Sequence, residues 1–435
     1  MIKLKAENKK QTAFVYFISF FAFLLLYNLI YVGKMHGWHI NDITYTYHLV
    51  DFKMGFVSSF LVGEIYHIIF GGRVDPTEVN TFNIVLLLLI FAFVSFMLAQ
   101  LISLKEDKRD RKALFILSMF FISGPYSFAL YTRLLGTLDV YFVFLAVLFV
   151  MFLSNKVLRF LAPVFYVLAV LNHFSALNTV IILFSLMLLY KAVTENKKAD
   201  KRIYYCIFAA SIVIGAGAAL YFFSHSESNL AYDINGFNAE LGRRCAENNT
   251  DMYYNIYYDY AIYHYFSHDG KNIYGIYPVE HFFPQLGGKL PAVLEGPLAE
   301  ILSHMRYNYL YYYANNMPVK IGIITVLFLL ALPVYIFFFG LWKRLIKQSK
   351  SKAESLFYAL CIIQPAVTFL GGIVYSGDPP RWTAFALMIQ FTLVFLAAKY
   401  SRDALDYIRE KLSKIRLSYI VLYFILYSSV IYDPY

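Results

Sequence analysis

Long apolar runs recur along most of this chain, and they restrict what it can fold into. Of its 435 residues, 60% are hydrophobic and only 15% are charged. A helix needs about 20 apolar residues to cross the ~30 Å hydrocarbon layer of a bilayer. The pattern predicts an all-α polytopic membrane protein with about 11 transmembrane helices. The predicted spans are Thr12–Val32, Thr81–Leu104, Ala113–Ala129, Val140–Leu153, Phe160–Leu171, Ala176–Tyr190, Ile203–Phe223, Ile321–Leu341, Leu356–Tyr375, Trp382–Ala398 and Leu417–Tyr432.

Lys and Arg are concentrated in alternate loops between these runs. Of the 38 Lys and Arg, 27 lie in the N-terminal segment and in every second loop after it, whereas 18 of the 28 acidic residues lie in the other loops. Loops rich in Lys and Arg resist translocation and stay cytoplasmic. The distribution predicts a multi-pass plasma-membrane protein with a cytoplasmic N-terminus. It also accounts for the net charge of +10 without a nucleic-acid partner.

A long outer segment, residues 224–320, is predicted to form a small extracytoplasmic domain. It separates an N-terminal bundle of about seven spans (1–223) from a C-terminal bundle of about four (321–435). The segment is rich in Tyr, especially in Met252–Phe266 and Tyr307–Asn316. Tyr favours the membrane surface, and its ring also offers an apolar face to a sugar. Both interpretations of the Tyr-rich stretches remain open.

The other long outer segment, residues 33–80, contains a four-residue repeat of small and polar side chains. This spacing predicts an amphipathic helix over Leu49–Phe70 that lies in the membrane interface. The alternative is a helix packed into the bundle with its small residues against a neighbour. The repeating residues are Asp51, Gly55, Ser59, Gly63 and His67.

The stretch Phe160–Tyr190 is predicted to enter and leave the membrane from the cytoplasmic side. Because this one stretch forms both legs, each leg is shorter than the roughly 20 residues that a full crossing needs. The turn at Asn172–Phe174, which includes His173, is therefore expected to lie below the outer surface, in a cavity open to the outside.

Charged residues close to the outer span ends are the best candidates for chemistry. A charge this close to hydrocarbon is costly and tends to mark function. A carboxylate there can accept a proton from a sugar hydroxyl, and an arginine can hold a phosphate with two hydrogen bonds. The alternative is a set of ion pairs at the membrane edge. The candidates are Asp42, Asp51, Arg133, Asp139, Asp378 and Arg381.

A cofactor is not predicted. The ten histidines all fall on the outer side, but none has the spacing of a zinc site. No phosphate-binding loop and no dinucleotide fingerprint occurs. Because nucleotide-sugars and ATP are absent outside the cytoplasm, a sugar donor there must arrive on a lipid.

The number of spans, the early acid in HINDITYTYHLVDFKMGF (residues 39–56) and the large outer segment before the last spans resemble bacterial envelope-glycan membrane proteins. These are the GT-C-type glycosyltransferases, which use polyprenyl-phosphate sugars, and the surface-polysaccharide polymerases. The resemblance implies that Asp42, shortly after the first span, is the catalytic base. It lacks the adjacent second acid that is common in that family's motif.

The leading hypothesis is an integral membrane glycosyltransferase or polysaccharide polymerase that acts at the outer face on polyprenyl-phosphate-linked sugars. Asp42 is the predicted base, with Asp51 as its substitute. Arg133 and Arg381 would hold phosphate. The same cleft would be lined by Asp139, His173 and Asp378. The alternatives are a transporter or lipid flippase for an envelope precursor, and a non-catalytic receptor or scaffold.

Overall fold

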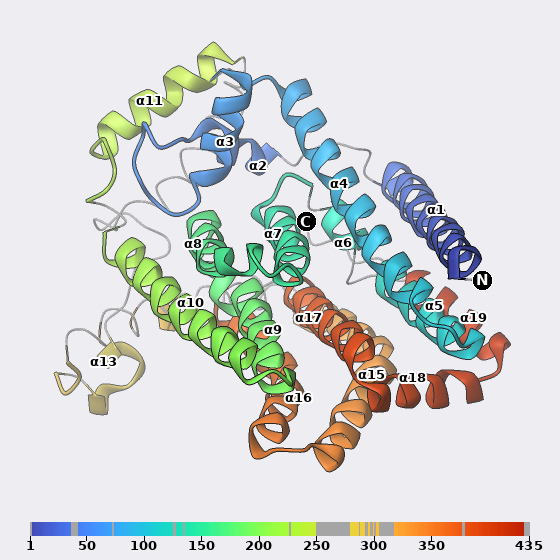
Figure 1. Cartoon of the computed structure of the whole chain (residues 1–435). Coiled ribbons are helices and arrows are strands. Elements are labelled where there is room, and N and C mark those ends of the chain that lie inside the picture. The colour runs from blue at the N-terminus through green and yellow to red at the C-terminus, as the bar shows by residue number, and fades with distance from the viewer. Residues whose placement is uncertain are drawn as a thin grey trace.

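The computed structural model describes residues 2–35, 42–71, 74–124, 128–133, 135–225, 228–248, 279–286, 288–291, 295, 299, 302–303, 317–375 and 379–429. Within these residues every regular element is a helix (Figure 1). The elements in chain order are α1 (Ile2–Met35), α2 (Asp42–Leu49), α3 (Leu61–Phe70), α4 (Pro76–Ser103), α5 (Lys108–Ser123), α6 (Phe128–Arg133), α7 (Leu138–Leu153), η1 (Leu158–Leu161), α8 (Ala162–Asn172), η2 (Phe174–Asn178), α9 (Val180–Thr194), α10 (Lys198–Ser224), α11 (Ile234–Glu247), α13 (Val279–Phe282), η4 (Pro284–Leu286), α15 (Met317–Gln348), α16 (Lys352–Tyr375), α17 (Pro379–Tyr400), α18 (Arg402–Lys414) and α19 (Leu417–Ser429).

Seven helical stretches among the described residues are long and apolar enough to cross a membrane. Each of the eleven predicted apolar runs lies on helix over most of its described length. Helices α7, α8 and α9 have 16, 11 and 15 residues, which is short for a crossing. The seven long stretches are Lys9–Leu29, Pro76–Ser103, Lys108–Arg133, Lys198–Phe222, Phe328–Gln348, Lys352–Gly371 and Arg381–Tyr400.

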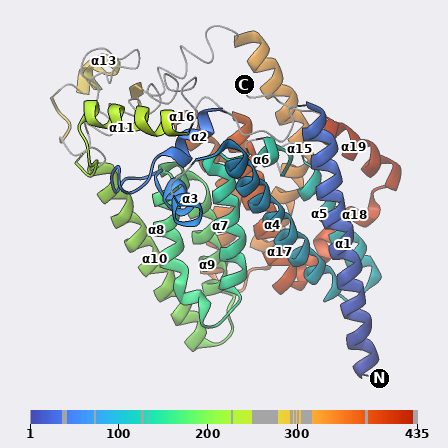
Figure 2. The same cartoon turned by 90° about the horizontal axis from the view of Figure 1, so that it is seen from above.

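The helices pack in groups that are neighbours in both orientations. Helix α1 runs along α4, and α8, α9 and α10 lie side by side (Figures 1 and 2). Helices α15, α16 and α17 form a third group, which joins the second through contacts of α16 and α17 with α9. The short helices α7, α8 and α9 thus each pack against at least one longer helix.

A buried polar network joins α15, α16 and α17. Pro365 has no N–H, so the carbonyl of Cys361, four residues earlier in α16, has no helical partner. The Nε2 of Gln390 donates to that carbonyl at 2.7 Å and to Oε1 of Gln364 at 2.8 Å. The Oε1 of Gln390 accepts from the indole of Trp342 at 2.8 Å. One glutamine therefore satisfies the backbone acceptor that the proline leaves open.

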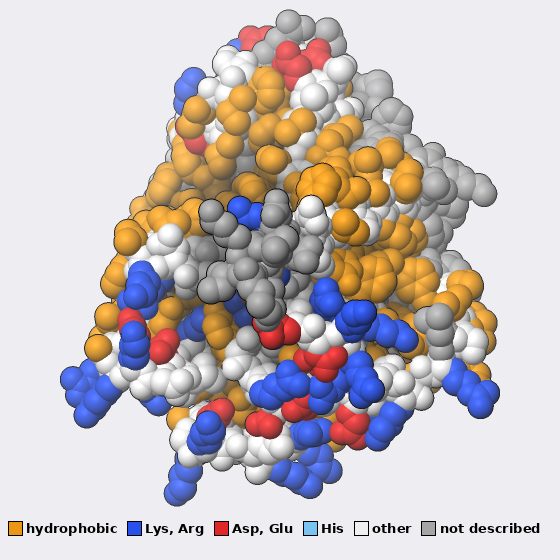
Figure 3. Space-filling view, turned by 45° about the vertical axis from the view of Figure 1, so that its right-hand side comes forward, with side chains coloured by type: hydrophobic (Ala, Val, Ile, Leu, Met, Phe, Trp, Pro, Cys, Tyr) orange, Lys and Arg blue, Asp and Glu red, His pale blue; other side chains and the backbone are white. Residues whose placement is uncertain are grey.

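The Lys- and Arg-rich loops meet at one end of the bundle, which we call the basic end. Lys105 donates to the carbonyl of Ala398 at 2.8 Å. Arg159 pairs with Asp200 at 3.1 Å. Figure 3 shows Lys and Arg side chains gathered toward this end, beside a broad hydrophobic surface. The loops of the basic end are 105–112, 154–159, 191–202, 343–352 and 399–416.

Most of the last basic loop is a helix that the apolar pattern did not indicate. Helix α18 buries Leu405 and Ile408 and lies against α5. Asp110 of α5 is buried and accepts from Arg402 at 2.9 Å and from Arg409 at 3.2 Å. A carboxylate shared by two guanidiniums therefore fixes α18 across the basic end.

The opposite end of the bundle, the far end, is where α8 stops at Asn172. The prediction of one helix over Leu49–Phe70 is wrong, because α2 ends at Leu49 and α3 begins at Leu61. The backbone between these helices forms hydrogen bonds with distant segments instead. Ser59 N donates to Leu171 O at 2.8 Å, and Phe56 N donates to Asn229 O at 3.1 Å.

Two residues in this loop have left-handed backbone torsions, which a regular helix excludes. Gly55 has φ 151° and Ser59 has φ 78°. A Cβ on Gly55 would lie 2.8 Å from Asn229 O. The backbone segments at Gly55 and Asn229 therefore approach so closely that only glycine fits there. Of the predicted helix, only its final part, α3, keeps helical form.

Candidate functional site

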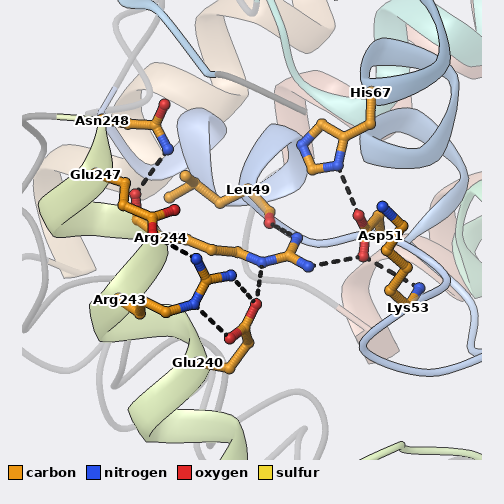
Figure 4. Close-up of polar contacts among 9 residues, drawn as sticks. All are labelled: Leu49, Asp51, Lys53, His67, Glu240, Arg243, Arg244, Glu247 and Asn248. Carbon is orange, nitrogen blue, oxygen red and sulfur yellow. Dashed lines mark hydrogen bonds and ion pairs between the residues drawn. The ribbon is translucent and has the colours of Figure 1, made fainter. Parts of the chain in front are cut away.

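Four charged or titratable side chains meet at the far end, and we call them the Asp51 cluster: Asp51, His67, Glu240 and Arg244 (Figure 4). Asp51 Oδ2 lies 2.7 Å from Nδ1 of His67, and Asp51 Oδ1 accepts from Nη2 of Arg244 at 3.0 Å. Arg244 also donates from Nε to Glu240 at 2.8 Å. The cluster therefore joins the loop after α2, the last turn of α3, and α11.

The cluster is largely shielded from water. The side chains of Asp51 and His67 are 3% and 9% exposed, and those of Arg244 and Glu240 are 11% and 14% exposed. Burial alone would raise the pKa of Asp51. The hydrogen bonds and charges of His67 and Arg244 outweigh it and hold the pKa well below its usual range. Asp51 is therefore ionised, and both of its oxygens are occupied.

The local backbone explains how Asp51 comes to face His67. Asp51 Oδ1 accepts from Lys53 N at 3.1 Å, which fixes the start of the loop. Helix α3 then returns across α2 in very close contact, since a Cβ on Gly63 would lie 1.7 Å from Val50 O. Only glycine permits this crossing, which brings the last turn of α3 beside Asp51.

Helix α11 is fixed to this end by packing and by hydrogen bonds. Its apolar side chains Phe237 and Leu241 are buried, and the ring of Phe237 stacks against Phe60. Arg244 Nη1 donates to Leu49 O at 2.6 Å, which ties α11 to the end of α2. Most of the predicted outer domain, including both Tyr-rich stretches, lies outside the described residues.

A second charged pair lies at the far end, where α7 and α17 begin. Arg381 donates from Nη2 to Oδ1 of Asp139 at 2.7 Å, and its Nε lies 2.5 Å from Oδ2. Asp139 is 1% exposed, whereas the Arg381 side chain is 23% exposed. A partly exposed arginine that is held by a buried carboxylate can meet an anion without losing its position.

His173 lies near this pair, in the turn between α8 and η2, and the charge of Arg381 acts on it. Its Nδ1 accepts from the backbone N–H of Ser175 at 3.0 Å. The predicted turn is confirmed. Its first residue, Asn172, is 1% exposed, and just before it Ser58 Oγ donates to Val170 O at 2.7 Å. His173 and Phe174 are partly exposed, so packed protein covers only the start of the turn.

The other predicted site residues stand apart or lie outside the description. Asp42 opens α2, and the helix carries its backbone about 10 Å from the loop that holds Asp51. The side chain of Asp42 lies outside the described residues, as does Asp378. Arg133 ends α6 and is half-buried. Among the described residues no direct contact joins the Asp51 cluster to the Asp139–Arg381 pair.

Three members of the Asp51 cluster were not predicted as site residues. His67 shares the four-residue spacing with Asp51, so the sequence held a signal for that pair, although the helix it implied is wrong. Arg244 and Glu240 lie in a distant part of the chain, and no motif marks them. Among the described residues, no group of three or more His, Cys, Asp or Glu could hold a metal ion.

Comparison with protein-family models, with curated proteins and with solved structures found no match for this chain.

Proposed function

We propose that this chain is an integral membrane glycosyltransferase or polysaccharide polymerase. It would use polyprenyl-phosphate-linked sugars at the outer face of the cytoplasmic membrane. The observation that carries the proposal is the Asp51 cluster, which combines a buried carboxylate, a largely shielded guanidinium and an imidazole at the far end. Loops rich in Lys and Arg stay on the cytoplasmic side. The position of the Asp51 cluster at the far end, away from the basic end, therefore supports a site on the outer side.

Transfer of a sugar from a lipid carrier needs a group that accepts a proton and a cation that binds phosphate. Arg381 suits the second task, because it is partly exposed and held in place by Asp139. Arg133, His173 and Asp378 remain proposed partners of the same substrate. Asp51 has a different role from the predicted one: its engaged carboxylate orients His67 and Arg244.

The test is turnover of lipid-linked sugars by the purified protein in nanodiscs. Polyprenyl-phosphate and polyprenyl-diphosphate sugars are supplied with a glycan acceptor, and both the released carrier and the new glycan are measured. Arg381→Lys should raise KM for the lipid donor at least tenfold, because lysine cannot form a bidentate contact with phosphate. Arg243→Lys, on the exposed side of α11, is the matched control and should leave KM unchanged.

Two results would count against the proposal. One is the absence of carrier release with every lipid-linked sugar. The other is movement of intact lipid-linked sugar between leaflets without bond cleavage, which would identify a flippase.

A further inference from the structure

We propose that Nε2 of His67 is the atom that accepts the proton of the attacking sugar hydroxyl. The inference rests on the proposed function and names the catalytic residue of its site. Asp51 and Arg244 are then positioning residues, which act on substrate only through His67.

The first support is the protonation geometry of His67. Asp51 is a carboxylate and can only accept, so the 2.7 Å contact requires the hydrogen of His67 to lie on Nδ1. In the neutral ring, Nε2 then carries the lone pair. It points away from Asp51 (Figure 4). This is the arrangement by which a carboxylate prepares a histidine to take up a proton.

The second support is that Nε2 of His67 is buried and has no hydrogen-bond partner among the residues that the structure describes. Buried polar atoms are nearly always paired, so one that is left open calls for an explanation. His48 provides the contrast within the same region. Its Nε2 lies 3.2 Å from the hydroxyl of Tyr141 and 3.1 Å from Nδ2 of Asn83, as expected of a structural histidine.

The third support is that Asp51 itself is unsuited to accept the proton. Each of its oxygens already accepts a hydrogen bond, from Arg244 or from His67. These partners hold the pKa of Asp51 below its usual range although burial opposes them. Once Nε2 is protonated, however, the same carboxylate stabilises the imidazolium that results. Arg244 keeps Asp51 in place during this change, since it is itself fixed by Leu49 O and Glu240.

In the proposed step, the hydroxyl oxygen of the acceptor sugar attacks the anomeric carbon of the lipid-linked donor and forms the new C–O bond. The bond from that carbon to the carrier phosphate breaks, and its electron pair leaves with the phosphate. The hydroxyl proton moves to Nε2 of His67 and is later released to water.

The deciding variant is His67→Asn. The Nδ2 of asparagine occupies nearly the position of histidine Nδ1, so the donor to Asp51 is kept while Nε2 is lost. We expect kcat to fall by about 100-fold or more, with KM changed little. His225→Asn, an exposed histidine at the end of α10, is the control and should match the wild type.

Each outcome decides between the two proposals. If the wild type transfers sugar and folded His67→Asn retains its rate, the inference is overturned and the proposed function stands. If the wild type transfers nothing, the proposed function fails and the inference fails with it.

If His67→Asn does not fold, a second measurement on the wild type still tests the inference. Histidine-selective ¹⁵N spectra of the active wild type should show His67 protonated on Nδ1 and unprotonated on Nε2. The opposite tautomer would overturn the inference.

Discussion

Arg381 and Asp139 stand 242 residues apart in the sequence, and their ion pair joins the first turn of α17 to the first turn of α7. The pair can be a structural tie, a phosphate site, or both. Asp139→Leu removes the buried carboxylate that holds Arg381 and should lower the free energy of unfolding by about 3 kcal/mol. The double variant Asp139→Leu/Arg381→Leu should recover much of that loss.

The two roles separate in the double variant. Recovered stability with lost transfer would assign Arg381 to substrate, as proposed. If stability and sugar transfer both recover, the pair serves only as a structural ion pair at the membrane edge. Stability is read from the midpoint of thermal unfolding in detergent, and activity from the same preparation.

Gly63 is predicted to tolerate no side chain. Because a Cβ there would lie 1.7 Å from Val50 O, Gly63→Ala forces α3 away from α2. We expect a loss of about 3 kcal/mol in unfolding free energy and loss of activity. Gly217→Ala is the control, since a Cβ there meets nothing within 4 Å and alanine favours helix by about 0.5–1 kcal/mol. Equal unfolding midpoints for the two variants would contradict the close crossing.

Stability should depend on pH through Asp51. Its pKa is lower in the folded protein than the usual 3.8, so its contribution is complete above about pH 4. The contribution begins to decline as the pH falls below 3.8 and is lost completely once the pH is below the folded-state pKa. The wild type should therefore lose more stability than Asp51→Asn between pH 7 and pH 3, measured by chemical unfolding. An equal loss would show that Asp51 is not stabilised as a carboxylate.

Arg244 is predicted to hold α11 against the end of α2 and the loop that follows it. Arg244→Gln removes its charge beside Asp51, so α11 should loosen and become more sensitive to protease at unchanged membrane insertion. Arg243→Gln is the control, because Arg243 is exposed and its ion pairs are with residues of α11 itself. If both variants resist protease equally, the packing of Phe237 and Leu241 and the hydrogen bond from Val74 N to Asn248 Oδ1 are enough to fix the helix.

The helical bundle was largely predictable because membrane-crossing helices are specified locally. Each predicted apolar run lies on helix over most of its described length, since an apolar segment in lipid must satisfy its own backbone hydrogen bonds. The prediction of one helix over Leu49–Phe70 failed because backbone N–H groups in this stretch donate hydrogen bonds to Leu171 and Asn229 instead. No local sequence pattern reveals these distant partners. Helix α18 was missed because its charges resemble those of a solvated loop.

The candidate site was predictable only where charges stood at the ends of apolar runs. Asp139 and Arg381 each begin a helix at the same end of the bundle, so topology alone brought them together. Asp51 was predicted as a site residue because it follows the first apolar run closely. Arg244, which pairs with Asp51, and Glu240, which pairs with Arg244, lie in a segment without a motif. Their contact depends on how α11 docks, which is a tertiary relationship.

The most direct test of an outer-face transferase is transfer from a labelled donor that is confined to one leaflet. Proteoliposomes are prepared with the protein in one orientation, which is established by protease access to α11 or to α18. Polyprenyl-phosphate sugar offered on the side of α11 should yield labelled glycan, and Asp51→Asn should abolish the product. Product formed only from donor offered on the side of α18 would contradict an outer site.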